Sequence, residues 1–366
     1  MGAIKPITND HSGDWHLDRF AEFAVAKAAI GEPVPHMRVV DWMCRDVGNW
    51  EALWRAGCYL AGYSVITGEG IWRSWSWEEM KKSGERFLTD WVDQNWGGFH
   101  TRVPRRCVRT PAAFARCLLS FAQWMRTDFD RLREESENRW ELTKRSGYEP
   151  GSTEYQATND TEYQEWWRSA ERIDFYGRYL AIRLLELSRR RGYMRADLYD
   201  IRAVGAHSPI RCLMLLRPDA VPGLLTGEPR YADAVAEEVK QELARRGSPM
   251  SYFIYATLLC EYRGCYEDGH DYAGNQHDEE LEYSLGRHAD FWRQKYGRES
   301  DLYAARAAID PHECLGEIAG WRRRRVRDED GVMNVAGLLR REGVVWSDVR
   351  HDYVASVAAG RVVSRS

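Results

Sequence analysis

Residues 258–283, "LLCEYRGCYEDGHDYAGNQHDEELEY", concentrate side chains that could carry out acid–base or metal chemistry. Seven carboxylates fall within residues 267–282, and no Lys or Arg occurs between Gly264 and Gly286 to neutralise them. Carboxylates gathered in this way bind a metal ion, hold an ammonium group, or act as acid and base. A solvated acidic helix start would explain residues 278–280, because carboxylates favour the positive end of the helix dipole. It does not explain the preceding loop of glycines, histidines and aromatic residues.

The most compact part of this acidic segment is "HDEELE", residues 277–282. On a helix Asp278 and Glu282 lie one turn apart, and Glu279 lies three residues before Glu282. With His277 they form our candidate catalytic group, for which we expect a bound ammonium rather than a metal. We expect no resident cofactor. Mg²⁺ is the alternative, because a divalent ion also suits a site that releases a charged phosphate.

A second segment, "RVPRRCVRTP" (residues 102–111), contains four arginines and no acid. It ends at a helix start, with Thr110 as N-cap and Pro111 in the first helical position. Guanidinium groups bind phosphate through paired hydrogen bonds, and a helix N-terminus adds backbone donors. We therefore predict that Arg105, Arg106 and Arg109 contact phosphate or DNA. A solvated basic loop is the alternative.

A third segment, "DIRAVGAHSPIRCL" (residues 200–213), predicts a glycine-containing turn that leads into a helix N-terminus. It is not a Walker A loop, because it has no Gly-Lys-Ser/Thr. An ordinary capped helix is the alternative. The candidate phosphate-binding residues of this segment are His207, Ser208 and Arg211. Arg263, in the segment 258–283, is a further candidate.

The composition of the 366 residues limits the partners that the protein could have. The formal net charge of −4 excludes a surface that is basic throughout, so a polyanion must meet a local patch. Eight cysteines include no Cys-x-x-Cys pair, which disfavours a structural zinc site. No stretch of 18 apolar residues occurs and the N-terminus has no apolar run, so we expect a cytoplasmic protein with no membrane partner.

The elements that must position these groups are predicted to be helices, because helical spacing recurs from residue 21 to 297 and strand patterns do not. We expect a mainly α fold in a single large helical domain, with a DNA-glycosylase-like arrangement as one candidate. Residues 1–20 would form an N-terminal arm and residues 21–320 the catalytic domain. Within it, polar residues 131–165 would be a helical extension followed by a loop or mobile insertion. Residues 321–366 would form a basic C-terminal segment, either a strand pair or a small appendage.

The helical spacing and the helix end signals together predict the ranges of the individual helices. They cover residues 21–30, 38–68 (two helices), 75–96 (two helices broken near Gly84), 110–126, 173–191, 208–218, 231–247, 251–264 and 277–297.

Several of these blocks together resemble a known family. "PRRCVRTP", "DFYGRYLAIRLLE", "DIRAVGAHSP" and "LLCEYR" followed by "GHDYAGNQHDEELEY" are similar to the phage amino acid:DNA transferases, first described as α-glutamyl/putrescinyl thymine pyrophosphorylases (clade 2). The similarity runs in order from about residue 35 to about residue 325, and "HDEELEY" is its most specific block. The family pattern has Tyr-Pro-Gly-Arg before Thr-His-Asp-Glu-Glu, whereas this chain has "YAGNQHDEE" and so lacks a Pro and an Arg.

The resemblance implies a transferase acting on phage DNA in the cytoplasm of an infected bacterial host. A kinase first converts 5-hydroxymethyluracil to its pyrophosphate ester, and the amine of a free amino acid then displaces pyrophosphate. Cys260 is a candidate thiolate that would add to C6 of the pyrimidine, and a buried, inert cysteine is the alternative. The base would leave the duplex and stack on an aromatic ring, for which the candidates are Tyr59, Tyr63, Trp72 and Tyr262.

Two other functions fit parts of the sequence. A metal-dependent hydrolase or nuclease would use residues 277–279 and Glu282 as ligands. A non-catalytic DNA-binding protein would use only the arginine clusters. For the transferase, the motifs at 105–109, 205–211, 260–263 and 277–282 must converge on one cavity, because displacement needs its reactants within a few ångströms.

Overall fold

The computed structural model describes residues 12–30, 35–198, 207–247, 249–264, 287–288 and 290–297. These residues are mainly helical and include no strand, which confirms the predicted fold class. Contacts within the chain define two compact units. Unit 1 comprises Met1–Val39, Asp200–Tyr283 and Arg306–Ser366, and unit 2 comprises Val40–Tyr199 and Ser284–Ala305. The predicted C-terminal appendage and most of the helix at 277–297 lie outside the described residues.

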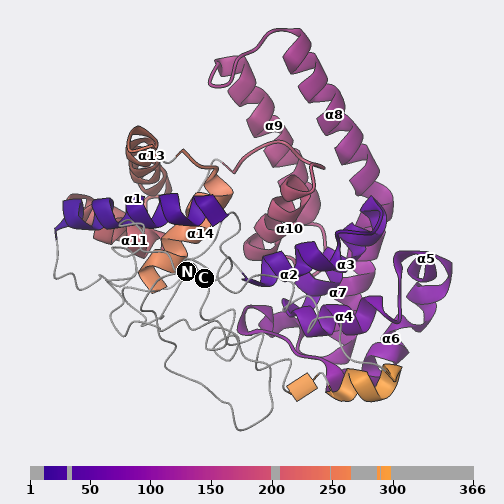
Figure 1. Cartoon of the computed structure of the whole chain (residues 1–366). Coiled ribbons are helices and arrows are strands. Elements are labelled where there is room, and N and C mark those ends of the chain that lie inside the picture. The colour runs from indigo at the N-terminus through magenta and orange to yellow at the C-terminus, as the bar shows by residue number, and fades with distance from the viewer. Residues whose placement is uncertain are drawn as a thin grey trace, which may run out of the picture. The chain divides into compact units, whose positions relative to one another are not determined.

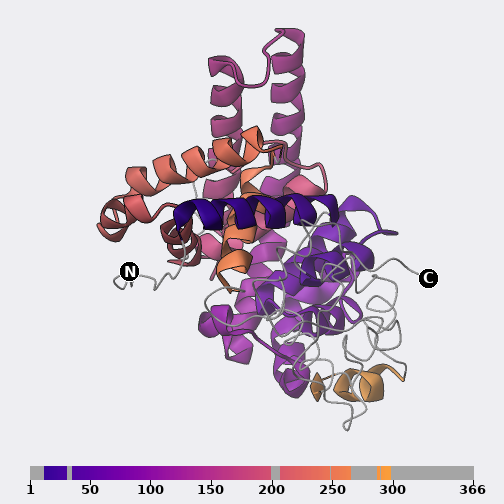
Figure 2. The ribbon, with the colours of Figure 1, turned by 60° about the vertical axis from the view of Figure 1, so that its left-hand side comes forward.

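Unit 1 is a cluster of helices around α11 and α14 (Figures 1 and 2). Its α-helices are α1 (Gly13–Ile30), α11 (His207–Leu216), α12 (Val221–Leu225), α13 (Pro229–Arg245) and α14 (Tyr252–Arg263). Helix α11 packs against α1, α13 and α14, and α1 also packs against α14. Helix α1 begins at Gly13, within the segment expected to be an arm. A Cβ atom on Gly13 would lie 2.5 Å from Cδ of Pro218, so glycine permits this close approach.

Unit 2 holds most of the tryptophans. Its helical elements are α3 (Asn49–Gly62), α4 (Val65–Trp72), α5 (Trp77–Glu79), η1 (Met80–Gly84), α6 (Glu85–Gln94), η2 (Trp96–Gly98), η3 (Val103–Val108), α7 (Pro111–Trp124), η4 (Met125–Phe129), α8 (Asp130–Arg145), α9 (Thr153–Ala170) and α10 (Arg178–Arg190). Helix α2 (Pro35–Met43) spans the sequence boundary between the units, and a helical segment at residues 287–288 and 290–296 also belongs to unit 2.

Helix α3 is the centre of unit 2 and packs against α4, α7 and α10. From Ala52 onward its side chains are almost all buried. A Cβ atom on Gly57 would lie 1.9 Å from Cε1 of Phe121 on α7, so only glycine allows the two helices to come this close. The buried indole of Trp54 packs against Trp77 and Phe121 and donates to the carbonyl of Trp75 at 2.6 Å.

The ends of several helices match the signals in the sequence. Thr110 caps α7 by accepting a hydrogen bond from the backbone N–H of Ala113 at 3.3 Å, and Pro111 occupies the first helical position. The break expected near Gly84 is instead a π-helical segment, η1, that joins α5 to α6. Helix α10 begins later than expected, at Arg178, because Phe175 adopts a left-handed conformation (φ 64°) just before the extended N-cap.

Helices α8 and α9 form an antiparallel pair that extends away from α3, α4 and α7 (Figures 1 and 2). The helical extension expected after residue 131 is confirmed as α8, whereas the loop or mobile insertion expected up to residue 165 is largely helix α9. Ser152 caps α9 by accepting a hydrogen bond from the backbone N–H of Tyr155 at 3.1 Å. This segment contains few aliphatic residues, because its buried side chains are mostly aromatic or polar.

A buried carboxylate, Glu162, joins this pair to the segment after α10. It is fully buried and accepts hydrogen bonds from Ser136 and Trp140 of α8. It also accepts from the backbone N–H groups of Arg195 at 3.0 Å and Ala196 at 2.8 Å. All four donors come from outside α9, so one side chain fixes the position of three segments.

We expect Glu162→Ala to lower the free energy of unfolding by about 3 kcal/mol, because buried donors would lose their acceptor at roughly 1–3 kcal/mol each, partly offset by relaxation. The matched control is Glu165→Ala on the same helix, whose half-buried carboxylate pairs with Arg139 at 2.7 Å. Such pairs contribute about 0–1 kcal/mol. Urea unfolding of the two variants and the parent protein measures both changes. Equal losses in the two variants would contradict this role for Glu162.

Candidate functional site

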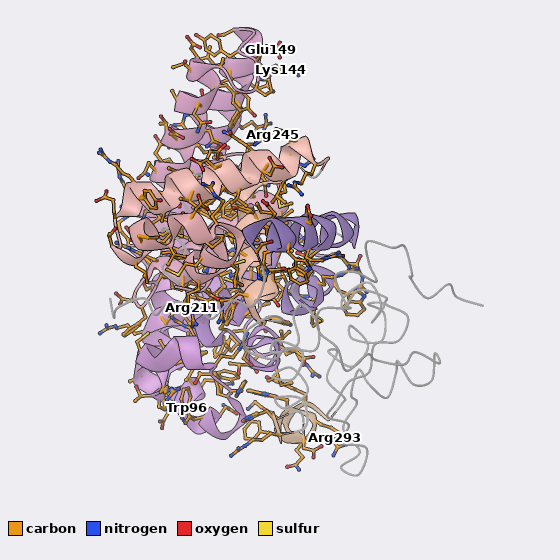
Figure 3. The ribbon with its side chains drawn as sticks, turned by 90° about the vertical axis from the view of Figure 1, so that its left-hand side faces the viewer. Trp96, Lys144, Glu149, Arg211, Arg245 and Arg293 are labelled. Carbon is orange, nitrogen blue, oxygen red and sulfur yellow. The ribbon has the colours of Figure 1, made fainter. Side chains whose placement is uncertain are left out.

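The structure brings together two of the sequence segments singled out for phosphate binding. Nε of Arg263, at the end of α14, donates a hydrogen bond to Oγ of Ser208, in the first turn of α11, at 2.6 Å. The two residues are 55 positions apart in sequence and are both half-buried. Because this bond uses Nε, it holds the guanidinium beside the helix N-terminus, where backbone N–H groups and the dipole also favour an anion. Arg211, labelled in Figure 3, extends from the same helix.

Cys260 lies one turn before Arg263 on α14 and is half-buried, so it shares this side of the helix pair. Cys212 of α11 is fully buried. Burial raises the pKa of the Cys212 thiol well above its usual range, and the charge of Arg263 opposes the rise. Cys260 also acts on the pKa of Cys212, so the two thiols are electrostatic neighbours. Cys260 is the more accessible of the two and therefore the better candidate for a nucleophile.

Tyr262 is part of the core of unit 1. It is buried, and its hydroxyl lies 3.1 Å from Nδ1 of the buried His16. Phe20 and Phe23 of α1 pack edge-on against its ring at centroid distances of 5.3 and 5.8 Å. A base cannot stack on a ring enclosed in this way. The role expected for Tyr262 is corrected to that of a residue joining α14 to α1.

The other proposed stacking residues are also interior. Tyr59, Tyr63 and Trp72 are buried in unit 2. The rings of Tyr59 and Tyr63 lie 5.3 Å apart, and the hydroxyl of Tyr179 donates to that of Tyr63 at 2.7 Å. Burial raises the pKa of both buried tyrosines well above the usual range. Their aromatic faces contribute to packing, which the sequence could not distinguish from base stacking because both use the same residue types.

The arginine-rich segment of unit 2 is divided between interior and surface. Arg105 is only 2% exposed; its Nε donates to the carbonyl of Ala61 at 2.8 Å and its Nη1 to that of Phe175 at 2.9 Å. Its Nη2 lies 3.2 Å from Sγ of Cys117. The phosphate contact expected for Arg105 is therefore corrected: its donors serve the fold. Arg109 is exposed.

Several candidate residues lie outside what the structure describes. His277, Asp278, Glu279 and Glu282 belong to the undescribed part of the chain, and for Arg106 and His207 only the backbone is described. The contact between Ser208 and Arg263 joins two of the four motifs that we expect to converge on one cavity. The convergence of all four motifs stays a prediction.

A buried polar cluster in unit 2 escaped the sequence interpretation. On α10, Nη1 of Arg183 donates to Oε2 of Glu186 at 2.6 Å, and both side chains are buried. The guanidinium carbon of Arg183 lies 5.2 Å from the ring centroid of Tyr179, and that of Arg102 lies 5.0 Å from the ring centroid of Tyr63. The available signal was an Arg–Glu pair three residues apart within residues 180–187, which are otherwise apolar, and such a pattern marks a stretch of helix buried on all sides.

No family model, curated protein or solved structure matches the chain. Across the described ranges, none of the helices combines the length and apolar character needed to cross a membrane. The same ranges contain no group of three or more His, Cys, Asp or Glu side chains placed to hold a metal ion. A functional assignment therefore depends on the residues and on the contacts among them.

We expect Arg105 and Arg109, two arginines of the 102–111 segment, to respond differently to replacement. Arg105→Ala should lower the free energy of unfolding by about 2–4 kcal/mol, because it leaves the carbonyls of Ala61 and Phe175 without their charged donor. Arg109→Ala should change it by less than about 0.5 kcal/mol, because the side chain is exposed. Urea unfolding measures both effects, and a small loss for Arg105→Ala would contradict its internal role.

If Arg109 contacts a DNA phosphate, Arg109→Ala should make the dependence of log affinity on log salt shallower by about 0.7–0.9. Fluorescence anisotropy with a labelled oligonucleotide over a salt series measures the slope. Arg245→Ala, which removes an exposed arginine of α13, is the control. An unchanged slope for Arg109→Ala would show that this arginine does not contact DNA.

Proposed function

We propose that the chain is an amino acid:DNA transferase that attaches an amino acid, through its amine, to the 5-methylene of pyrophosphorylated 5-hydroxymethyluracil in phage DNA. The observation that carries the proposal is the hydrogen bond between Arg263 and Ser208. It joins "LLCEYR" and "DIRAVGAHSP", two blocks that resemble this family but are far apart in sequence. It also places a guanidinium at a helix N-terminus, an arrangement suited to a phosphate group.

In the proposed reaction the lone pair of the amine nitrogen attacks the 5-methylene carbon. The bond between this carbon and the pyrophosphate oxygen breaks, and pyrophosphate leaves with the electron pair. The leaving group carries negative charge, which Arg263 and the first turn of α11 are suited to stabilise. The amine loses its proton to a base within the acidic group of His277, Asp278, Glu279 and Glu282.

In this proposal Cys260 divides the displacement into two steps, so that pyrophosphate leaves before the amine forms its bond to the methylene carbon. Addition of its thiolate to C6 of the pyrimidine breaks the C5–C6 double bond and moves electron density toward C5, which helps to expel pyrophosphate. The amine then adds to the exocyclic methylene, and loss of the thiolate restores the ring. Its half-buried position one turn from Arg263 supports this role, because the nucleophile and the group that binds the leaving group must face the same substrate.

The direct test is incubation of the protein with DNA containing pyrophosphorylated 5-hydroxymethyl-dU and a panel of amino acids. Nucleoside mass spectrometry should find a new amino acid adduct, with release of one pyrophosphate for each adduct. DNA cleavage in place of an adduct would identify the metal-dependent nuclease. DNA binding with neither product would identify a non-catalytic DNA-binding protein.

We expect Arg263→Lys to lower the rate of transfer about 10- to 100-fold, because lysine keeps the charge but loses the Nε–H that binds Ser208 and the planar guanidinium fork. Arg245→Lys, on the exposed side of α13, is the matched control and should leave the rate unchanged. A rate unaffected by Arg263→Lys would remove this residue from the site.

The acidic group is tested by amino acid titration in EDTA-treated buffer. If it holds the ammonium of the substrate, Asp278→Asn should raise the amino acid concentration needed for half-maximal rate and leave DNA affinity unchanged. The parent protein should stay active in EDTA, with a rate that rises with pH as the bound amine loses its proton. Activity that returns only on addition of Mg²⁺ or Mn²⁺ would show that the group holds a metal.

A further inference from the structure

A strained aromatic residue lies in the loop between α9 and α10. Phe175 adopts a left-handed backbone conformation (φ 64°), which is costly for a residue with a bulky side chain but not for glycine. Its side chain is only half-buried, and in the described part of the chain no other aromatic ring contacts it. The ring therefore does not serve the aromatic core. Backbone strain of this kind is common at ligand-binding sites.

Hydrogen bonds hold this loop in place. Nη1 of the buried Arg105 donates to the carbonyl of Phe175 at 2.9 Å. The backbone N–H of Asp174 donates to Oγ of Ser120, on α7, at 2.8 Å. The next residue along the chain, Tyr176, is buried. The backbone is thus fixed on both sides of the Phe175 ring, so the position of the ring is set before any ligand binds.

An exposed arginine of α7 lies over this ring. The guanidinium carbon of Arg116 is 4.4 Å from the ring centroid of Phe175. Nε of Arg116 also lies 3.0 Å from Oδ2 of Asp174, so a ring and a carboxylate together orient the guanidinium. The side chain of Arg116 is nevertheless 64% exposed. A surface arginine is thereby held in place while solvent reaches the side of the guanidinium that faces away from the ring.

A guanidinium held in this way can stack with a nucleic acid base. Stacking uses the flat face of the group, whereas the ion pair with Asp174 uses an N–H bond in its plane. The carboxylate therefore leaves the face of Arg116 open. In complexes with single-stranded nucleic acids, bases stack on arginine planes as well as on aromatic rings.

The charges beside the stack favour a polyanion. Residues 102–116 contain no Asp or Glu. Sγ of Cys107, in this segment, lies 3.9 Å from Nη1 of Arg105, the nitrogen that also binds the loop. Two residues later Arg109 is exposed, as is Arg178 in the first turn of α10, and neither forms an ion pair with a described residue. Exposed arginines of this kind can bind phosphates.

We propose that Arg116, held by Phe175 and Asp174, is a stacking platform for an unpaired base of DNA, and that Arg109 and Arg178 bind the adjacent phosphates. The base lies on the exposed face of the guanidinium, so that the ring, the arginine and the base form one stack. The platform accepts any base, because every base has a π face. The inference deepens the proposed function, on which it rests for the choice of DNA as the polymer.

The test compares two labelled strands by fluorescence anisotropy with the full chain. One is an oligothymidylate of about 12 nucleotides, and the other is a strand of the same length in which every base is replaced by an abasic site. The two strands carry the same phosphates, so the difference in affinity measures contacts to the bases. We expect the parent protein to bind the oligothymidylate at least about tenfold more tightly.

Arg116→Lys keeps the charge but removes the planar group. We expect it to lower the affinity for the oligothymidylate about tenfold and for the abasic strand less than about twofold. Arg172→Lys is the matched control, because Arg172 is also 64% exposed and pairs with Asp128 at 2.6 Å, but lies over no ring in the described part of the chain. The control should change neither affinity by more than about twofold.

Phe175→Leu keeps an apolar side chain but removes the ring behind the guanidinium. We expect it to lower the affinity for the oligothymidylate about threefold or more and to spare the abasic strand. Thermal unfolding checks that each variant is folded, and the comparison of the two strands in the parent protein stands without the variants.

Three results would overturn the proposal. The first is a parent protein that binds both strands equally or binds neither. The second is an equal loss on both strands in Arg116→Lys, which would mean that the arginine acts through its charge. The third is no loss on either strand. Adduct formation without a base preference would remove the stack and leave the transfer reaction, whereas a base preference that depends on Arg116, without adduct formation, would do the opposite.

Discussion

The arrangement of unit 2 depends on the contacts that the buried guanidinium of Arg105 makes with three segments. It binds the carbonyls of Ala61, near the end of α3, and Phe175, before α10, and it lies against Cys117 of α7. Backbone carbonyls at such positions lack partners within regular helices, so a buried cation with five donors can satisfy several at once. This requirement explains why an arginine is buried in a core otherwise built from aromatic rings.

Much of the fold could be predicted from sequence, because helix caps and helical spacing are local signals. Thr110 and Pro111 mark the start of α7 correctly for that reason. The exposure of individual charged and aromatic residues is a property of tertiary packing. A run of arginines looks the same whether one member is buried, as Arg105 is, or exposed, as Arg109 is. Tyr63 and Tyr262 were misjudged for the same reason, and the polar sequence of α9 concealed a helix whose buried face includes Trp166.

The candidate site could be predicted only in part. Its residue types were visible in sequence, but the 2.6 Å contact between Ser208 and Arg263 depends on how α11 packs against α14. The contact of Arg116 with Phe175 likewise joins α7 to the loop before α10. Such contacts produce no periodic pattern in the sequence, because the formation of the pair places no requirement on the residues beside either member.

The turn between α8 and α9 has a practical consequence. Residues 145–151 are almost all exposed, Gly147 and Gly151 adopt positive φ angles, and Figure 3 shows Lys144 and Glu149 at this end of the helix pair. Exposed turns of this kind tolerate insertions and are the first sites cut by proteases. A peptide tag or a fluorescent protein inserted here would leave the carboxylate of Glu162 in place, three turns away along α9. A single cut would leave two fragments joined by this carboxylate together with the packing of α8 on α9 and of α3 on α10.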